Sequence, residues 1–166
     1  MPAEEELLRQ GANRMSNVLV IFQADTERTE QLALAVGVGA VESEANIRLR
    51  RLAAAGAVEV GHKGYGTLKE TDLVWADIFV VGLEDAQPKQ ELDGLLSALT
   101  AADKSTFPQK QAWTFGAEGA AGKTEALSYV EAAFQAAGVT VLPALVPDSG
   151  DATERMKETG RQLARR

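Results

Sequence analysis

Eight consecutive residues in the second half of the chain have the types and order that bind nucleotide phosphates elsewhere. They read Ala117-Glu118-Gly119-Ala120-Ala121-Gly122-Lys123-Thr124. In a phosphate loop of this kind, backbone N–H groups surround the phosphates while Lys and Thr reach the terminal phosphate and Mg²⁺. Such a domain also needs further strands, one of which supplies an Asp for Mg²⁺, and the sequence after Thr124 indicates a single strand. We therefore do not expect nucleotide hydrolysis.

The composition excludes several other kinds of site. The 166 residues contain no Cys and one His, His62, which excludes disulfides, thiolate metal sites, thiol nucleophiles and mechanisms with two histidines. A formal net charge of −7 argues against nucleic-acid partners and anionic membranes. No apolar run approaches the roughly 20 residues of a membrane span. We predict no metal site and, because "MPAEEELLRQ" does not resemble a secretory signal, a cytoplasmic protein.

The rest of the chain alternates between strand and helix patterns. We interpret residues 1–14 as an N-terminal extension and 15–166 as a single domain, in keeping with 45% apolar residues. Continuous apolar runs such as "NVLVIFQ" and "ADIFVVGL" are typical of strands buried on both faces. The predicted strands are 17–23, 45–53, 76–83, 110–117 and 139–146. The predicted helices are 25–42, 67–75, 88–102, 123–138 (closed by Gly138) and 149–166, with a loop over 54–66.

This alternation predicts the fold class and the edge at which a ligand binds. Strands separated by helices form an open parallel α/β sheet covered on both faces, with right-handed crossovers. Ligands of such sheets bind beyond the carboxyl ends of the strands. We therefore expect a site among the loops 23–29, 83–88 and 116–123. The basic run "RLRR" at 48–51 has the alternation of a solvated strand face.

Three stretches carry a resemblance to a known family. "TERTEQLALAV" is similar to the end of a Ser/Thr-rich first loop, usually of the form T-G-N-T-E. "FGAEGAAGKTEALSYVEAAFQAAGVTVLP" resembles a third, glycine-rich flavin loop with its helix, and "DATERMKETGRQLA" resembles a last helix. From about residue 17 to 165 the chain resembles flavodoxin-like proteins: short-chain flavodoxins, flavodoxin domains of diflavin proteins, and Trp-repressor-binding-type quinone reductases. The resemblance implies a doubly wound, five-stranded parallel sheet of order 2-1-3-4-5 in three layers.

The resemblance also implies a cofactor, FMN, at the carboxyl edge of the first, third and fourth strands. The first loop would hold its phosphate, and the other two would flank the isoalloxazine. The flavin would perform electron transfer, so no side chain is predicted to be catalytic, and a redox protein or a quinone would be the partner. The predicted cofactor-binding residues are Ala24, Asp25, Thr26, Glu27, Arg28, Thr29, Leu83, Glu84, Asp85, Phe115, Gly116, Ala117, Glu118 and Gly119.

Two positions depart from the family's pattern. Glu27 stands where the first loop usually has Gly, and residues 83–88, "LEDAQP", lack the usual stacking aromatic. Asp25, Thr26 and Thr29 also fit a simple role in capping the helix that follows. Two hypotheses therefore stand. The first is an FMN-binding electron carrier or NAD(P)H-dependent flavin/quinone reductase, and the second is a flavin-free binding or regulatory module.

Overall fold

The computed structural model describes residues 16–23, 27–52, 68–83, 90–116, 125–142 and 152–165. Their five strands form one parallel sheet in the order β2-β1-β3-β4-β5. The strands are β1 (Asn17–Phe22), β2 (Asn46–Arg51), β3 (Ile78–Leu83), β4 (Gln111–Gly116) and β5 (Thr140–Val141). The helices are α2 (Glu27–Glu42), α3 (Glu70–Trp75), α4 (Gln90–Ala101), α5 (Glu125–Ala136) and α6 (Ala152–Ala164), with a 3₁₀ turn at Phe107–Gln109. The predicted strand order is confirmed.

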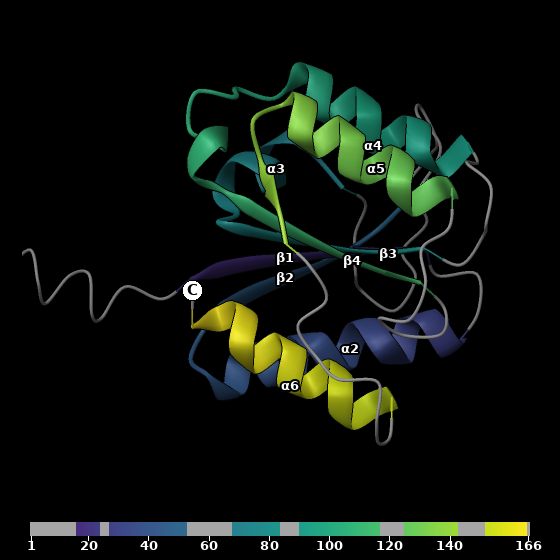
Figure 1. Cartoon of the computed structure of the whole chain (residues 1–166), viewed down its shortest axis with the longest axis vertical. Helices are drawn as coiled ribbons and strands as arrows, with labels where there is room; N and C mark the ends of the chain where they lie inside the picture. Colours follow the sequence, from purple (N-terminus) through teal and green to yellow (C-terminus); the bar gives the residue numbers. More distant parts are fainter. Residues whose placement is uncertain are drawn as a thin grey trace, which may run out of the picture.

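The sheet is the middle of three layers. Figure 1 shows α3, α4 and α5 on one face and α2 and α6 on the other. Successive strand residues point to opposite faces, so in β1 Leu19 and Ile21 join the α3–α5 core while Val20 and Phe22 join the α2–α6 core. Because both faces of β1 and β3 are covered, their side chains are apolar without interruption from Val18 in β1 and throughout β3.

The α2–α6 layer depends on a close approach of two helix backbones. A Cβ atom added at Gly39 of α2 would lie 2.7 Å from the carbonyl carbon of Lys157 in α6. One added at Gly160 of α6 would lie 2.9 Å from the backbone nitrogen of Ala40. Glycine at both positions lets the helices pack with their backbones in contact. Gly39 is buried in this contact, whereas its neighbour Val38 is exposed.

The end of α5 also follows the sequence prediction. Gly138 has φ +100°, a left-handed conformation that glycine adopts without strain. The N–H of Val139 then donates to the carbonyl of Phe134 at 2.9 Å and leads the chain into β5. Of the predicted strand 139–146, the described part is paired at Thr140 and Val141, and residues 143–146 lie outside the described residues, as does the predicted loop 54–66. The sequence pattern did not reveal the 3₁₀ turn at Phe107–Gln109.

Lys110 is a buried cation at the amino end of β4. Its Nζ donates to the carbonyl of Val74 at 3.0 Å and to the carbonyl of Ala76, at the end of α3. Burial lowers the pKa of Lys110 from its ordinary value, and the charge of Asp77 opposes this shift. The ammonium group thus binds carbonyl oxygens that the short helix leaves unpaired.

Candidate functional site

The carboxyl ends of β1, β3 and β4 meet at one edge of the sheet. Phe22 pairs with Gly82, and Gly82 pairs in turn with Phe115. One step further toward the edge, Leu83 pairs with Gly116, and the N–H of Gln23 donates to the carbonyl of Gly82 at 3.1 Å. The strand ends from which the three predicted loops start are therefore neighbours. We call these strand ends, at Phe22–Gln23, Gly82–Leu83 and Phe115–Gly116, the carboxyl edge.

Thr29 is a described polar side chain at the end of the predicted first loop. It lies in the first turn of α2, which begins at Glu27, four residues after Gln23. Its side chain is 0% exposed. Within the described part of the chain its Oγ1 has no hydrogen-bond partner. A buried hydroxyl without a partner costs about 1–3 kcal/mol, so the position is suited to a group that accepts a hydrogen bond. The N–H groups of the first helical turn also lack intrahelical partners.

At the carboxyl edge, the Phe115 side chain points to the face of the sheet that α2 and α6 cover, away from α5. It is 1% exposed and belongs to the α2–α6 core. Its ring stacks on Trp113 with centroids 5.7 Å apart and lies over Gly82, where an added Cβ would come within 2.7 Å of Cε2. Both aromatic residues of β4 are therefore core residues. The placement of Phe115 gives its ring no exposed face for a ligand.

Gly116 and Leu83 form the other face of the same edge. Leu83 is buried in the α3–α5 core. A Cβ added at Gly116 would lie 3.6 Å from Cδ1 of Leu127 and 3.9 Å from the carbonyl oxygen of Leu83, which are ordinary contacts. The edge is therefore roomy at Gly116 and tightly packed at Gly82.

The remaining predicted residues can be placed only in part. Glu27 and Arg28 begin α2, and the structure describes their backbone. Whether the predicted set binds a cofactor stays a prediction. The predicted residues outside the described ranges are Ala24, Asp25, Thr26, Glu84, Asp85, Ala117, Glu118 and Gly119.

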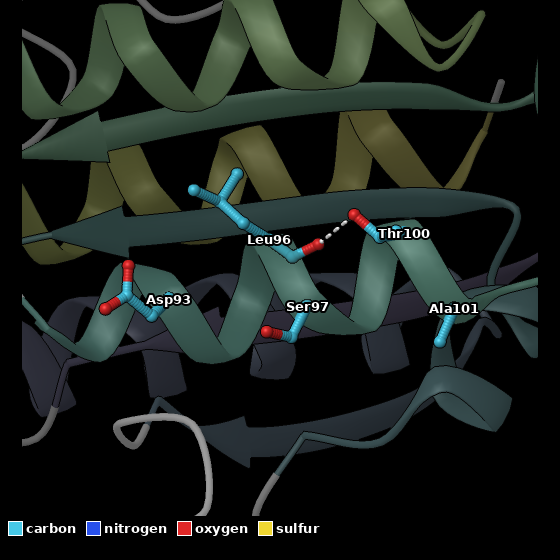
Figure 2. Close-up of a pocket in the computed structure, with 5 residues that line it drawn as sticks. All are labelled: Asp93, Leu96, Ser97, Thr100 and Ala101. Carbon is cyan, nitrogen blue, oxygen red and sulfur yellow. Dashed lines mark hydrogen bonds between the residues drawn. The ribbon is translucent and has the colours of Figure 1, made fainter.

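Two shallow pockets on α4 and α5 are separate from this edge. The larger, of about 420 Å³, lies along the outer side of α4 (Figure 2). The other, of about 310 Å³, lies between α4 and α5 and is lined mainly by Leu and Ala side chains, with Lys104 at one end. No predicted site residue lines either pocket. In the described ranges, no three acidic or histidine side chains gather as a metal site would require. The residues that line the larger pocket are Asp93, Leu96, Ser97, Thr100 and Ala101.

Comparison with solved structures identifies the architecture. The flavodoxin-like domain of a Synechococcus protein superposes with a TM-score of 0.58 at 20% identity, over 89% of this chain and 96% of that one. A diflavin flavoprotein from Nostoc gives 0.62 at 17% identity, over 90% and 92%. Flavodoxin 2 from Bacillus cereus gives 0.65 at 16% identity, over 90% and 99%. The chain has a flavodoxin-like fold. No protein-family model and no curated protein sequence matches it.

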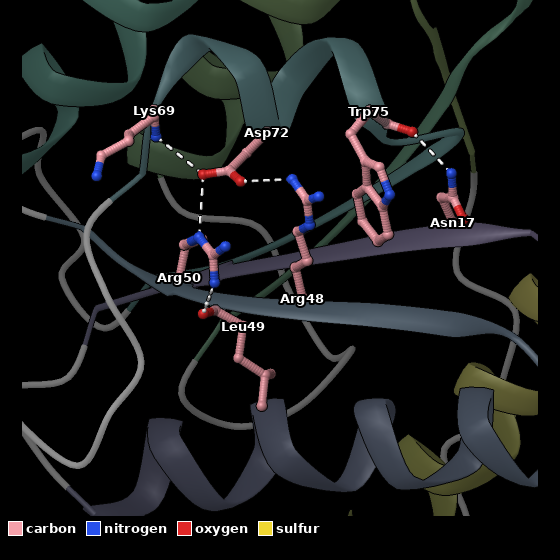
Figure 3. Close-up of polar contacts among 7 residues, drawn as sticks. All are labelled: Asn17, Arg48, Leu49, Arg50, Lys69, Asp72 and Trp75. Atoms are coloured by element: carbon pink, nitrogen blue, oxygen red, sulfur yellow. Dashed lines mark hydrogen bonds and ion pairs between the residues drawn. The ribbon is translucent and has the colours of Figure 1, made fainter.

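In this flavodoxin-like fold the edge strand β2 carries a polar cluster that corrects one expectation. Figure 3 shows Asp72 of α3 between two arginines: Arg48 Nη1 and Arg50 Nε each lie 3.0 Å from one of its carboxylate oxygens. The N–H of Lys69 donates to the same carboxylate at 3.0 Å. Arg48 also lies 4.2 Å above the ring of Trp75, a cation–π contact.

The predicted solvated basic face of β2 therefore holds only in part for these two side chains. Arg48 and Arg50 are 35% and 27% exposed, and both bind a carboxylate that is only 4% exposed. Their spacing of two residues, which places both on one face of a strand, was the available sequence signal. Asp72 itself gave none, because the chain does not reveal that α3 packs against that face. Among the described residues no helix is long and apolar enough to cross a lipid bilayer.

Proposed function

We propose that this protein binds FMN at the carboxyl edge and acts as an electron carrier or as an NAD(P)H-dependent flavin/quinone reductase. The proposal rests on one observation above all: the buried hydroxyl of Thr29 has no partner among the described residues and lies in the first turn of α2. The first turn of a helix binds phosphate through its unpaired N–H groups and the helix dipole. A threonine hydroxyl there adds one further donor.

The chain's own residues would bind and position the cofactor. Thr29 and the backbone N–H groups at the start of α2 would hold the phosphate. The edge at Leu83 and Gly116 would lie beside the ring system, because their strands end next to β1. When bound, FMN supplies one- or two-electron transfer. A redox protein or a quinone would accept the electrons, and no side chain is needed as a proton-transfer catalyst.

A second candidate, a flavin-free binding or regulatory module, is favoured by a different observation. Neither aromatic residue of β4 faces the carboxyl edge, since Trp113 and Phe115 are both buried in the α2–α6 core. The last described residues of the three strand ends at that edge, Gln23, Leu83 and Gly116, are not aromatic. A site that binds phosphate but has no ring to stack on the isoalloxazine would bind FMN weakly, with about the same affinity as inorganic phosphate.

Replacing Thr29 by valine tests the phosphate role directly. Valine has the shape of threonine without the hydroxyl. We expect the cofactor-free protein to gain about 1 kcal/mol of unfolding free energy, because an unsatisfied buried polar atom is removed. We expect the Kd for FMN to rise at least about tenfold, because a hydrogen bond to a charged group contributes about 1.5–3 kcal/mol. Urea unfolding and flavin fluorescence titration measure the two effects.

Thr159→Val is the matched control. Thr159 is equally buried, but its hydroxyl donates to the carbonyl of Arg155 at 2.9 Å and it lies in α6. This variant should leave FMN affinity unchanged and should not be stabilised. The proposed role of Thr29 is wrong if Thr29→Val binds FMN as tightly as the unchanged protein.

A further inference from the structure

The outer side of β2 has the properties of a strand-binding edge. In the sheet order β2 is terminal and pairs with β1 on one side. Asn46 N–H donates to the carbonyl of Ser16 and Leu52 N–H to that of Phe22, each at 2.9 Å. In a parallel pair, alternate residues face the same neighbour. The N–H and C=O groups of Ile47 and Leu49 therefore point away from the sheet, and no described strand pairs with them.

One of these outward groups already attracts a donor. The guanidinium of Arg50 donates through Nη1 to the carbonyl oxygen of Leu49 at 3.0 Å (Figure 3). A side chain there takes the place that the N–H of another strand would occupy. Because this is a contact between neighbouring residues at the surface, an added strand can replace it without breaking the sheet.

The two faces of this edge differ in chemistry. On the α3 face, Arg48 and Arg50 are held side by side by Asp72 and remain about one third exposed. A guanidinium has five N–H donors, so the bond from Arg48 to Asp72 leaves it able to bind a second carboxylate.

On the α2 face the edge is apolar. Ile47 and Leu49 are half-buried beneath Gly37 of α2. Leu34 and Val41, three residues before and four after Gly37, lie on the same side of that helix. Val41 is 51% exposed. A strand added to β2 would therefore place alternate side chains against arginine and against aliphatic groups.

We infer that the outer edge of β2 binds an extended acidic segment of a partner protein, in which acidic side chains alternate with apolar ones. Added strands gain affinity from main-chain hydrogen bonds and specificity from alternate side chains. Acidic side chains on one face meet Arg48 and Arg50, and apolar ones on the other meet Leu49 and Val41. A second copy of this chain is a poorer occupant, because antiparallel pairing of two β2 strands sets their arginines against each other.

Binding of a labelled peptide of alternating Glu and Val tests this inference. Fluorescence anisotropy should show saturable binding. The Kd should rise at least about tenfold when Lys replaces Glu in the peptide, and by a similar factor in the protein variant Arg48→Glu. Methylating the peptide's backbone nitrogens should abolish binding. Val41→Glu, at an exposed position that does not endanger the fold, should weaken binding several-fold. Arg155→Glu, on α6 and outside the proposed surface, is the control and should bind as the unchanged protein does.

Amide hydrogen exchange locates the contact. The peptide should slow exchange at Ile47 and Leu49, whose N–H groups point outward, and leave Arg48 and Arg50 unchanged, because β1 already protects theirs. The inference is overturned if the Glu/Val peptide does not bind, if the Lys/Val peptide binds equally, or if the protected amides lie elsewhere. It is also overturned if concentrated protein alone dimerises with the same protection, since the occupant is then a second copy.

Discussion

Gly39→Ala is expected to destabilise the protein by about 3 kcal/mol, lowering Tm by about 6–12 °C. On an exposed helix the same change would stabilise by about 1 kcal/mol, because alanine has the higher helix propensity. Here the new methyl group meets the backbone of Lys157, with the carbonyl carbon 2.7 Å away. Backbone atoms in the middle of a helix cannot move aside as a side chain can, so α6 must shift as a body. Thermal unfolding measured by circular dichroism gives the size of the effect.

Gly37→Ala separates this clash from helix propensity. Gly37 lies on the same helix, but a Cβ there meets the end of the Ile47 side chain at 3.3 Å, a flexible group that moves by a few tenths of an ångström. We expect its Tm to change little in either direction. If Gly39→Ala is as stable as Gly37→Ala, the two helices are not in backbone contact at Gly39.

Asp72→Ala is expected to cost about 2 kcal/mol of unfolding free energy, a Tm decrease of about 4–8 °C. The change removes the acceptor of two arginines and of the Lys69 N–H at the start of α3. Breaking a buried ion pair costs about 3–5 kcal/mol. The smaller value applies here because Arg48 and Arg50 are partly exposed, so water hydrates them when the carboxylate is lost. Equilibrium urea unfolding measures the difference.

Asp103→Ala is the control for Asp72. Asp103 is an exposed carboxylate that accepts a hydrogen bond from the N–H of Ser105 at 3.0 Å, and no other described helix or strand supplies it with a partner. This local bond lowers the pKa of Asp103, but the solvated side chain ties no two elements together. Its loss should shift the urea midpoint far less than the loss of Asp72. Equal effects would mean that the cluster between β2 and α3 contributes no more than a surface turn.

The layered fold was predictable because burial leaves a pattern in the sequence. Strands covered on both faces must be apolar where they are buried, as β1 is from Val18 onward and β3 is throughout. Gly138 marked the end of α5 because only glycine adopts its φ without strain. These features depend on neighbouring residues in the chain, and their alternation predicts an open parallel sheet with right-handed crossovers. The doubly wound strand order was implied by the family resemblance.

The details of the site depend on contacts between distant residues, which the sequence does not reveal. Alternation in β4 places Trp113 and Phe115 on one face, but only the packing of α2 and α6 shows that this face is core. Thr29 looked like an ordinary capping residue, and its lack of a partner among the described residues emerges only when α2 is packed on the sheet. Asp72 and Arg48 are joined across two elements, so neither alone indicated the ion pair.

Adding FMN to the purified protein tests the central claim most directly. We predict that flavin fluorescence is quenched to a one-to-one end point and that the yellow colour stays with the protein through desalting. In Thr29→Val the same titration should require at least about tenfold more FMN, since one bond to the phosphate is lost. A colourless protein that leaves added FMN fully fluorescent would contradict the account and favour the flavin-free module.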